Sequence, residues 1–520
     1  MERWNRWVDE HERITLGALL LFYLAVGLSQ ASVKLLWTDE LITYYLSEQP
    51  GLGGVWRALE AGCDPNPPLL HLLVKGSTAL LGGNAVGIRV PAVLCVLVAI
   101  LAMWWLLRRW VRPVFALAGT LAFMATRGFD YAYDARSYAP MMAFTMGSLA
   151  FWTLANDLAG WRRAVALGGM AAMLTAGVSS NYYGVLALFP IAIGEIVGRR
   201  WRTGSWIAMG LGSLPLIAYL PLIRHGIAEF GPHAWNRPQV SMLTMSYVEL
   251  VEAIFWPVLV LGIWAFRHRE SLSPLEMKAS QLRPEMAAVG VLLVYPFFGY
   301  AIAAGIAGMI SPRCVVPVCC GIGLTAGVLG QQVFGASRRA GTAFVLGLVV
   351  WVGVRELVCE HILREQRDAF FRLRDRAAGY RVKGEPGQIL VGDSLFALPF
   401  YFYSGVETRQ RIEFPVDFDA IHRMEKDDSG EQNIWAGRNG VLPMRILAFA
   451  DVDLNTPVSL AIARSDGWLA TEMRRRGVPL IAATEQEGSP GSDWRRLGGV
   501  FTPMAHPGTE MLYTRSDPVR

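Results

Sequence analysis

Charged residues are scarce in this sequence. Only 18% of its 520 residues are Asp, Glu, Lys or Arg, whereas 53% are hydrophobic and the mean hydropathy is +0.33. A soluble protein of this length could not bury so much apolar surface, which excludes that class. Apolar windows of about 20 residues, such as 14–36 and 88–107, are nearly free of charge, and each could cross roughly 30 Å of hydrocarbon. The sequence therefore indicates a polytopic membrane protein.

A concentrated basic surface is also missing, as is a metal-binding pattern of cysteines. The net charge is +5, but the basic residues form short clusters between apolar windows, so no nucleic acid is expected as a partner. The six cysteines have no metal-ligand spacing and are interpreted as packing residues. A disulfide between Cys63 and Cys359 is the alternative for two of them.

The apolar windows predict about eleven transmembrane helices. They lie near 14–36, 87–107, 113–128, 138–156, 163–179, 182–198, 204–222, 248–266, 287–309, 314–333 and 340–357. The first window is too long for a signal-peptide core, so it is expected to remain as a helix with the N-terminus in the cytoplasm. In this orientation every predicted cytoplasmic turn carries arginine, as the positive-inside rule requires, and the C-terminus lies outside.

Two segments are expected to lie outside the membrane spans. Residues 37–87 are predicted to be a first extracytoplasmic loop built of interfacial helices, because a crossing by residues 67–81 would place the arginine-rich turns outside. From residue 358 onward the charge rises and the long apolar windows stop. Residues 1–357 are thus expected to form a transmembrane domain, and residues 358–520 an extracytoplasmic soluble α/β domain. Its strands are expected near 388–391, 445–449 and 478–482.

Acidic residues gather where the first span should emerge. Asp39 and Glu40 follow Trp37 there, and one of these carboxylates, partly desolvated, could take a proton from an acceptor that attacks a sugar. The alternative is that both acids only favour the dipole of the helix that follows. Asp64, on a proline-rich turn, is either a helix cap or a second acid, and His71 is expected to be structural.

Single arginines mark two other external ends. Arg136 lies in the segment from Phe129 to Pro140, and Arg313 opens an otherwise apolar span. A planar guanidinium is a bidentate clamp for phosphate, although an arginine at this depth can also simply snorkel to the headgroups. The polar and aromatic side chains near these ends are candidates for a substrate pocket, or belong to an aromatic belt. They are Tyr133, Tyr138, Asn181 and Tyr182.

Several short motifs occur in a fixed order along roughly residues 10–335. They are Asp39-Glu40, Asn66-Pro67-Pro68-Leu69, Arg89-Val90-Pro91, Ala135-Arg136-Ser137-Tyr138-Ala139 and Arg313-Cys314-Val315-Val316-Pro317. In this order they resemble the C-type glycosyltransferase (GT-C) superfamily, in particular bacterial relatives of the dolichyl-phosphate-mannose protein mannosyltransferases and of the aminoarabinose transferase of lipid A. Asn66 stands where that family has histidine, and Cys314 where it has tyrosine.

The resemblance implies an inverting transfer of a hexose or pentose from a polyprenyl-phosphate donor. The acceptor would be a protein, a glycan or a lipid, on the extracytoplasmic side of a bacterial inner membrane. Asp39 would be the base, supported by Glu40 and Asp64, and Arg136 and Arg313 would hold the phosphate. These groups are expected to meet at the outer leaflet. A divalent metal remains an open alternative.

Two other functions compete with this interpretation. A transporter or lipid flippase would place charges within the spans near the midplane, whereas here the charges gather at one face. An esterase is suggested by Gly392-Asp393-Ser394, which resembles the nucleophile turn of GDSL hydrolases. Pro503 stands where such an enzyme needs an aspartate before His506, so Asp393 and Ser394 are expected to cap a helix instead.

Overall fold

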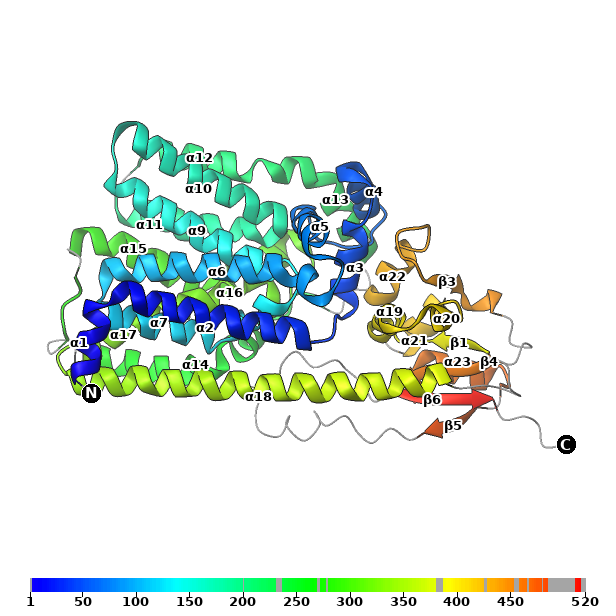
Figure 1. Cartoon of the computed structure of the whole chain (residues 1–520). Coiled ribbons are helices and arrows are strands. Elements are labelled where there is room, and N and C mark those ends of the chain that lie inside the picture. The colour runs from blue at the N-terminus through cyan, green and yellow to red at the C-terminus, as the bar shows by residue number, and fades with distance from the viewer. Residues whose placement is uncertain are drawn as a thin grey trace. The chain divides into compact units, whose positions relative to one another are not determined.

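The computed structural model describes most of the chain (Figure 1). The described residues are 2–199, 201–230, 236–268, 272–276, 279–379, 387–424, 428–452, 458–464, 467–478, 480–484 and 510–515. They divide into two compact units. The helical unit comprises Met1–Ser32, Asn66–Leu220 and Asn236–Val358, and the sheet unit comprises Val33–Pro65, Pro221–Trp235 and Cys359–Arg520.

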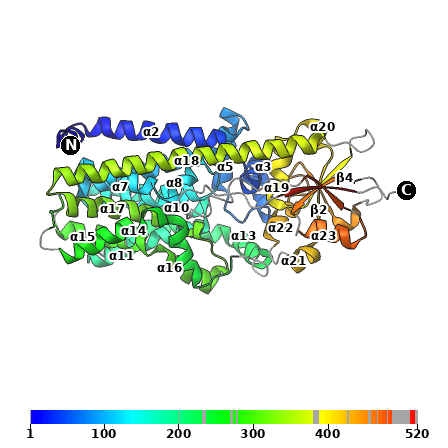
Figure 2. The same cartoon turned by 90° about the horizontal axis from the view of Figure 1, so that it is seen from below.

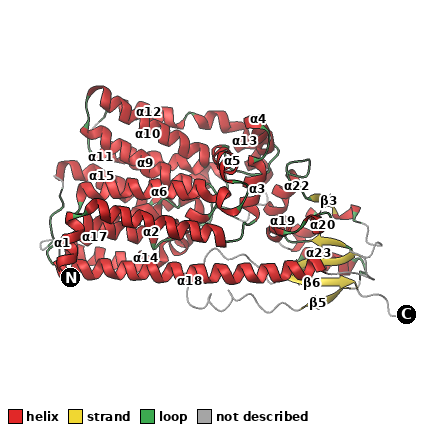
Figure 3. Ribbon diagram, viewed as in Figure 1, coloured by secondary structure: helices red, strands yellow, loops and turns green. Residues whose placement is uncertain are grey.

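The helical unit is a bundle of α-helices, drawn in red in Figure 3. Its helices are α1 (Glu2–Glu10), α2 (Glu12–Val33), α5 (Leu69–Leu81), α6 (Ala85–Trp110), α7 (Pro113–Met124), α8 (Arg127–Asp130), α9 (Tyr138–Asp157), α10 (Gly160–Ser180), α11 (Leu188–Val197), α12 (Thr203–Ser213), α14 (Ser241–Arg267), α15 (Ala279–Leu293), α16 (Tyr295–Ile302) and α17 (Val318–Phe334). Short helical turns are η1 (Tyr131–Tyr133), η2 (Tyr182–Ala187), η4 (Ala303–Ala307) and η5 (Pro312–Val315). Two further helices, α13 (Pro215–Phe230) and α18 (Arg338–Gly379), contribute residues to both units.

Each predicted membrane span falls on a helix or on consecutive helices, and the chain is a multi-pass membrane protein. Among the described residues, five helices are long and apolar enough to cross a membrane: α2, α6, Thr203–Ala228, α14 and α18. The pair Leu282–Leu293 and Tyr295–Ala307, bent by 58°, makes a sixth if it forms one span. The total of eleven spans stays a prediction, because several of the remaining helices are shorter than a bilayer requires.

Local chemistry explains where these helices begin. The Asn84 side chain accepts hydrogen bonds from the backbone N–H groups of Val86 and Gly87, which caps α6. Pro113 occupies the first turn of α7, where its missing N–H costs nothing. The caps fix each helix start within the apolar stretch and so set which residues reach the helix ends.

Helices α7 and α17 approach each other through glycine. A β-carbon on Gly119 would lie 2.6 Å from the carbonyl oxygen of Gly323, and one on Gly323 would lie 2.9 Å from the carbonyl oxygen of Gly119. Apolar side chains gain little by pairing inside lipid, so close backbone packing of this kind stabilises a membrane bundle. The two helices are therefore held at a distance that only glycine permits.

The sheet unit contains a six-stranded mixed sheet in the order β3-β2-β1-β4-β6-β5. Figure 2 labels two of its strands, β2 and β4. The strands are β1 (Gln388–Val391), β2 (Ile412–Val416), β3 (Arg445–Ala448), β4 (Val458–Arg464), β5 (Leu480–Thr484) and β6 (Glu510–Arg515). The first four are parallel, and β6 runs antiparallel to β4 and β5. Its helices are α3 (Thr38–Ser47), α4 (Gly51–Glu60), α19 (Ser394–Tyr403), α20 (Val406–Arg409), α21 (Phe418–Met424), α22 (Ser429–Ala436) and α23 (Trp468–Arg475), with one turn, η6 (Phe449–Asp451). The predicted small α/β region is confirmed.

Residues 37–87 are helical, as predicted, but they are shared between the two units. Helices α3 and α4 belong to the sheet unit and α5 to the helical unit, with the division after Pro65. A second division falls after Val358, beside the boundary predicted from composition. None of the six cysteines is in a disulfide, so the alternative of a bridge between Cys63 and Cys359 is wrong.

Candidate functional site

Two of the sequence motifs and the pocket candidate Asn181 meet in the helical unit, at Ser137. The hydroxyl of Ser137 donates to Oδ1 of Asn66 over 3.0 Å, and Nδ2 of Asn181 donates to the Ser137 oxygen over 2.9 Å. Nδ2 of Asn181 also donates to Oδ1 of Asn66, over 3.5 Å. The residues come from the first loop, the start of α9 and the end of α10, so the contact joins segments that are far apart in sequence.

Arg136 directly precedes this contact. Its side chain is buried, and its backbone N–H donates to the Asp134 carbonyl over 2.7 Å. A buried guanidinium needs an anionic or hydrogen-bonding partner, because desolvation of an isolated charge is costly. The position of Arg136, between Asp134 and the Ser137 contact, is therefore suited to an anionic ligand as well as to the carboxylates of the protein.

Arg313 has an electrostatic effect on Tyr131, in the segment from Phe129 to Pro140 that also contains Arg136. The pKa of Tyr131 is raised by burial, and the positive charge of Arg313 opposes that rise. Glu249 and Asp134 reinforce the rise, so these charged groups are all within electrostatic reach of one hydroxyl. The rings of Tyr131 and Tyr138 pack with their centroids 4.8 Å apart. Arg313 is thus within electrostatic reach of Tyr131, five residues before Arg136 in the sequence.

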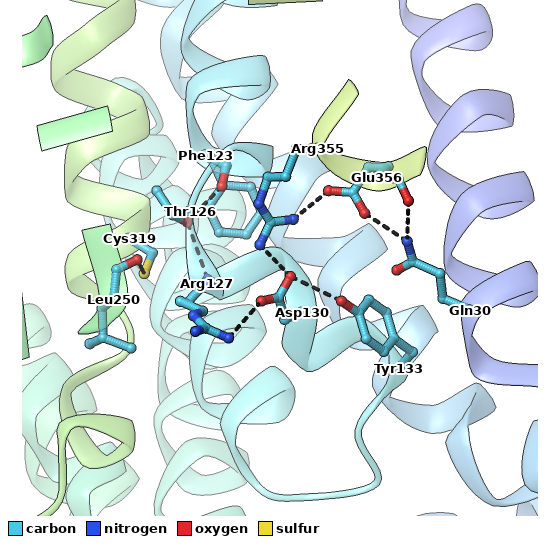
Figure 4. Close-up of polar contacts among 11 residues, drawn as sticks. Gln30, Phe123, Thr126, Arg127, Asp130, Tyr133, Leu250, Cys319, Arg355 and Glu356 are labelled. Carbon is cyan, nitrogen blue, oxygen red and sulfur yellow. Dashed lines mark hydrogen bonds and ion pairs between the residues drawn. The ribbon is translucent and has the colours of Figure 1, made fainter. Parts of the chain in front are cut away.

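A buried ion network holds Asp130 and Tyr133, near the start of the segment from Phe129 to Pro140 (Figure 4). Asp130 Oδ1 accepts from Arg355 Nη2 over 2.5 Å and from the Tyr133 hydroxyl over 3.0 Å, and Asp130 Oδ2 lies 3.5 Å from Arg127 Nη1. Arg355 also pairs with Glu356, whose Oε2 accepts from Gln30 Nε2 over 2.9 Å. Asp130, Arg355 and Glu356 are each about 3% exposed or less. The network contains two positive and two negative side chains, so its charges balance in a buried environment.

The predicted acids Asp39 and Glu40 lie in the sheet unit, in the first turn of α3. Glu40 is fully buried, and its Oε2 accepts from the backbone N–H of Trp37, the N-cap residue of α3, over 3.4 Å. Asp39 is only partly buried. The alternative of a helix-terminus role therefore describes Glu40 well, whereas Asp39 keeps access to solvent.

The remaining predicted residues differ in their surroundings. Asp64 is 4% exposed in the sheet unit, and His71 is fully buried on α5. The Tyr133 hydroxyl is part of the ion network, and Tyr182 packs against Tyr219 with ring centroids 6.3 Å apart. Across the described ranges, no group of three or more His, Cys, Asp and Glu side chains is arranged to hold a metal ion.

The motif that suggested an esterase has a structural role. Oδ1 of Asp393 accepts from the backbone N–H of Leu395 over 2.8 Å, so Asp393 caps α19 as predicted. Ser394 is the first residue of that helix and is 8% exposed. Helix capping therefore explains Asp393 and Ser394, and a role of Ser394 as a nucleophile is not needed to explain the motif.

Comparison with known proteins bears on the fold. A family model described as dolichyl-phosphate-mannose-protein mannosyltransferase matches residues 65–225. No curated protein sequence matches at a significant level. The crystal structure of ArnT from Cupriavidus metallidurans in the apo state is similar with a TM-score of 0.58 and 15% identity, over 90% of this chain and 96% of that chain. The same protein bound to undecaprenyl phosphate gives a TM-score of 0.54 and 14% identity, over 96% and 97%.

The chain has a GT-C fold. The resemblance inferred from the short motifs is thereby confirmed, and the matched residues 65–225 contain the motifs of Asn66, Arg89 and Arg136. Neither comparison supports a transporter. Within the GT-C fold, the Ser137 contact joins the end of the first loop to two later helices.

Sequence reasoning missed several members of this neighbourhood. Glu249 lies on α14, and Arg355 and Glu356 lie on α18. Each occurs within a helix that has other polar residues nearby, so none was singled out from the sequence. A signal was present in the sequence, because charged side chains within an apolar helix normally face a partner inside the protein. The identity of that partner, Asp130 for Arg355, required the fold.

Proposed function

We propose that this protein is an inverting glycosyltransferase that moves a monosaccharide from a polyprenyl-phosphate donor to an acceptor on the extracytoplasmic side of a bacterial inner membrane. The observation that carries the proposal is the hydrogen bonding of Asn66, Ser137 and Asn181 beside the buried Arg136. The similarity to ArnT structures, one of them bound to undecaprenyl phosphate, supports a lipid-linked donor. The family model supports a sugar as the transferred group.

The proposed chemistry has one displacement step. Asp39 takes a proton from the acceptor oxygen or nitrogen while that atom bonds to the anomeric carbon. The bond between the anomeric carbon and the phosphate oxygen breaks, and polyprenyl phosphate leaves with the electron pair. A single displacement inverts the anomeric centre. Arg136 and Arg313 are proposed to stabilise the phosphate, which gains charge as it leaves.

The sugar and the acceptor are narrower questions than the reaction class. Hexosyl and pentosyl donors are both compatible with the proposal, and the acceptor is a protein, a glycan or a lipid. In the proposed orientation the N-terminus is cytoplasmic and residues 358–520 form an extracytoplasmic domain. The arginines in alternate turns support this orientation through the positive-inside rule.

The proposal is tested with the purified full-length chain in liposomes. Synthetic polyprenyl-phosphate hexoses and pentoses are supplied with membrane extract as a source of acceptors, and the release of polyprenyl phosphate and the glycosylated products are followed by mass spectrometry. We expect transfer from at least one donor, lost in Asp39→Asn and in Arg136→Gln. The matched controls are Asp368→Asn and Arg162→Gln, which change exposed residues of the same types. Full activity of Asp39→Asn would falsify the assignment of the base.

A further inference from the structure

Helix α3, which carries Asp39, is bonded at its start to a helix of the α/β domain. The backbone N–H of Leu36 donates to the Tyr403 hydroxyl over 2.9 Å, and the Thr38 hydroxyl donates to the Ser394 carbonyl over 2.7 Å. Ser394 and Tyr403 are the first and last residues of α19. All four residues belong to the sheet unit. Both ends of α19 therefore hold the three-residue stretch that leads to Asp39.

A ring contact extends the attachment along α3. Tyr44, on the second turn, packs edge to face against Phe402 with centroids 6.0 Å apart. Edge-to-face aromatic pairs of this kind are stabilising beyond the burial of their area. The attachment consequently restrains the tilt of α3 as well as its starting point.

Tyr403 is itself rigidly placed. Its carbonyl accepts from Arg374 Nη1 over 3.0 Å, and its ring packs against Phe370 and Phe371 with centroids 5.8 and 5.6 Å away. At the other end of α19, the Asp393 cap follows directly on β1, and the Gly392 carbonyl accepts from Trp468 Nε1 over 3.0 Å. Helix α19 is thus fixed both to the sheet and to α18.

The two acids of α3 are used differently. Glu40 is buried and accepts a hydrogen bond from the backbone N–H of Trp37, whereas Asp39 is partly exposed. Residues 36–38 are therefore restrained by hydrogen bonds to α19 and by the hydrogen bond from Trp37 to Glu40 of α3 itself. What this arrangement leaves accessible in the first turn is the Asp39 side chain.

We propose that Thr38 and Tyr403 are positioning residues for Asp39, and that the α/β domain takes part in catalysis by fixing the helix that carries the base. This inference rests on the proposed function. Proton transfer in the displacement step requires the base within hydrogen-bond distance of the acceptor atom. A displacement of about 1 Å can cost roughly 100-fold in rate, so the restraint affects turnover more than donor binding.

The test uses variants that remove one hydroxyl each. Tyr403→Phe keeps the ring packing on Phe370 and Phe371, and Thr38→Val keeps the volume of the side chain. We expect kcat to fall about tenfold or more in each, with the donor KM within about twofold of wild type. Thr408→Val, at a buried position of α20 in the same unit, is the matched control and should change neither constant. Thermal unfolding midpoints of all variants are measured alongside, and we expect them within about 2 °C of wild type.

A second measurement separates positioning from a general loss of structure. In the Asp39→Asn background the residual rate is followed in a single turnover with radiolabelled donor. If Tyr403 acts through Asp39, then Tyr403→Phe adds no further loss there, whereas a general structural effect would multiply the loss. Two results would overturn this inference but not the proposed function. One is an unchanged kcat in both Tyr403→Phe and Thr38→Val, and the other is an equal fold-loss of rate from Tyr403→Phe in the wild type and in Asp39→Asn. An absence of transfer by the wild type with every donor would overturn the proposed function and this inference with it.

Discussion

Arg355 on α18 donates a hydrogen bond from Nη2 to Asp130 Oδ1 over 2.5 Å, across 225 positions of sequence. Both side chains are buried, and Glu356 and Arg127 complete the charge balance around them. Asp130 closes the short α8, six residues before Arg136. The pair therefore anchors the segment that presents the proposed phosphate ligand.

Removing one partner of this pair should destabilise the fold. Asp130→Asn leaves the network with two arginines and Glu356 as its carboxylate, so one buried positive charge is uncompensated, which typically costs about 3–5 kcal/mol. We expect a clear drop in the thermal unfolding midpoint of the purified protein in detergent. The double variant Asp130→Asn with Arg355→Met removes both charges, and it should be more stable than Asp130→Asn alone. A double variant that is the less stable of the two would contradict the ion-pair interpretation.

Charge and shape at Arg136 should be separable. Arg136→Gln removes the charge, and we expect kcat/KM for the donor to fall by roughly 100-fold or more if the guanidinium stabilises the leaving phosphate. Arg136→Lys keeps the charge but loses the planar bidentate fork, so it should recover part of the activity and not all of it. Steady-state kinetics with Arg162→Gln as control decides the point. Equal activity of the Gln and Lys variants would argue against an electrostatic role.

The Asn66 contact predicts a dependence on pH in one variant. The Asn66 amide oxygen accepts from Ser137, and a neutral histidine in its place could accept the same bond through one ring nitrogen. Below about pH 6.5 the imidazole becomes protonated and has no acceptor left. Asn66→His should therefore lose donor kcat/KM by about fivefold more than wild type as the pH falls from 8 to 5.5. Parallel pH profiles of the two proteins would remove this contact from the site.

Cys63 should be chemically inert in the folded protein. Burial raises the pKa of its thiol to about 12, with Asp64 adding to the rise. At pH 8 almost none of the reactive thiolate is present, so alkylation of Cys63, followed by peptide mass spectrometry, should be negligible until denaturant is added. The folded pKa lies above the unfolded value, so this contribution to stability is complete below about pH 9 and is lost as the pH rises toward 12. Rapid native-state labelling at pH 8 would show that the site is open.

The sequence predicted the helical elements well because apolar length is a local signal. The window 14–36 corresponds to α2, and the stretch 388–391 is β1 itself. Strand β2 was missed because Pro415 interrupts the run and Glu413 is buried within it, paired with Arg445 on β3. A buried carboxylate in a strand is understandable only once its partner on the neighbouring strand is known.

The candidate site was predicted in part for a similar reason. The motifs identified Asn66, Arg136 and Asn181 separately, but the hydrogen bonds through Ser137 depend on how α9 and α10 pack. The interpretation of Asp39 and Glu40 as a pair could not distinguish the capping carboxylate from the accessible one, since that difference depends on side-chain direction within one helical turn. Those roles for the acids remain predictions.

The glycine contact between α7 and α17 bears on how the protein is made. The ribosome synthesises α17 about 200 residues after α7, which at ordinary elongation rates is a delay of roughly 10–40 s. During that time Gly119 has its neighbour Leu107 on α6, but its contacts with Gly323 and Gly327 on α17 are missing, so this part of α7 must be covered by lipid, the insertion machinery or another helix. The contact between Gly119 and Gly323 forms only after α17 has been synthesised. Quality control during biogenesis should therefore be most sensitive to changes at these two positions.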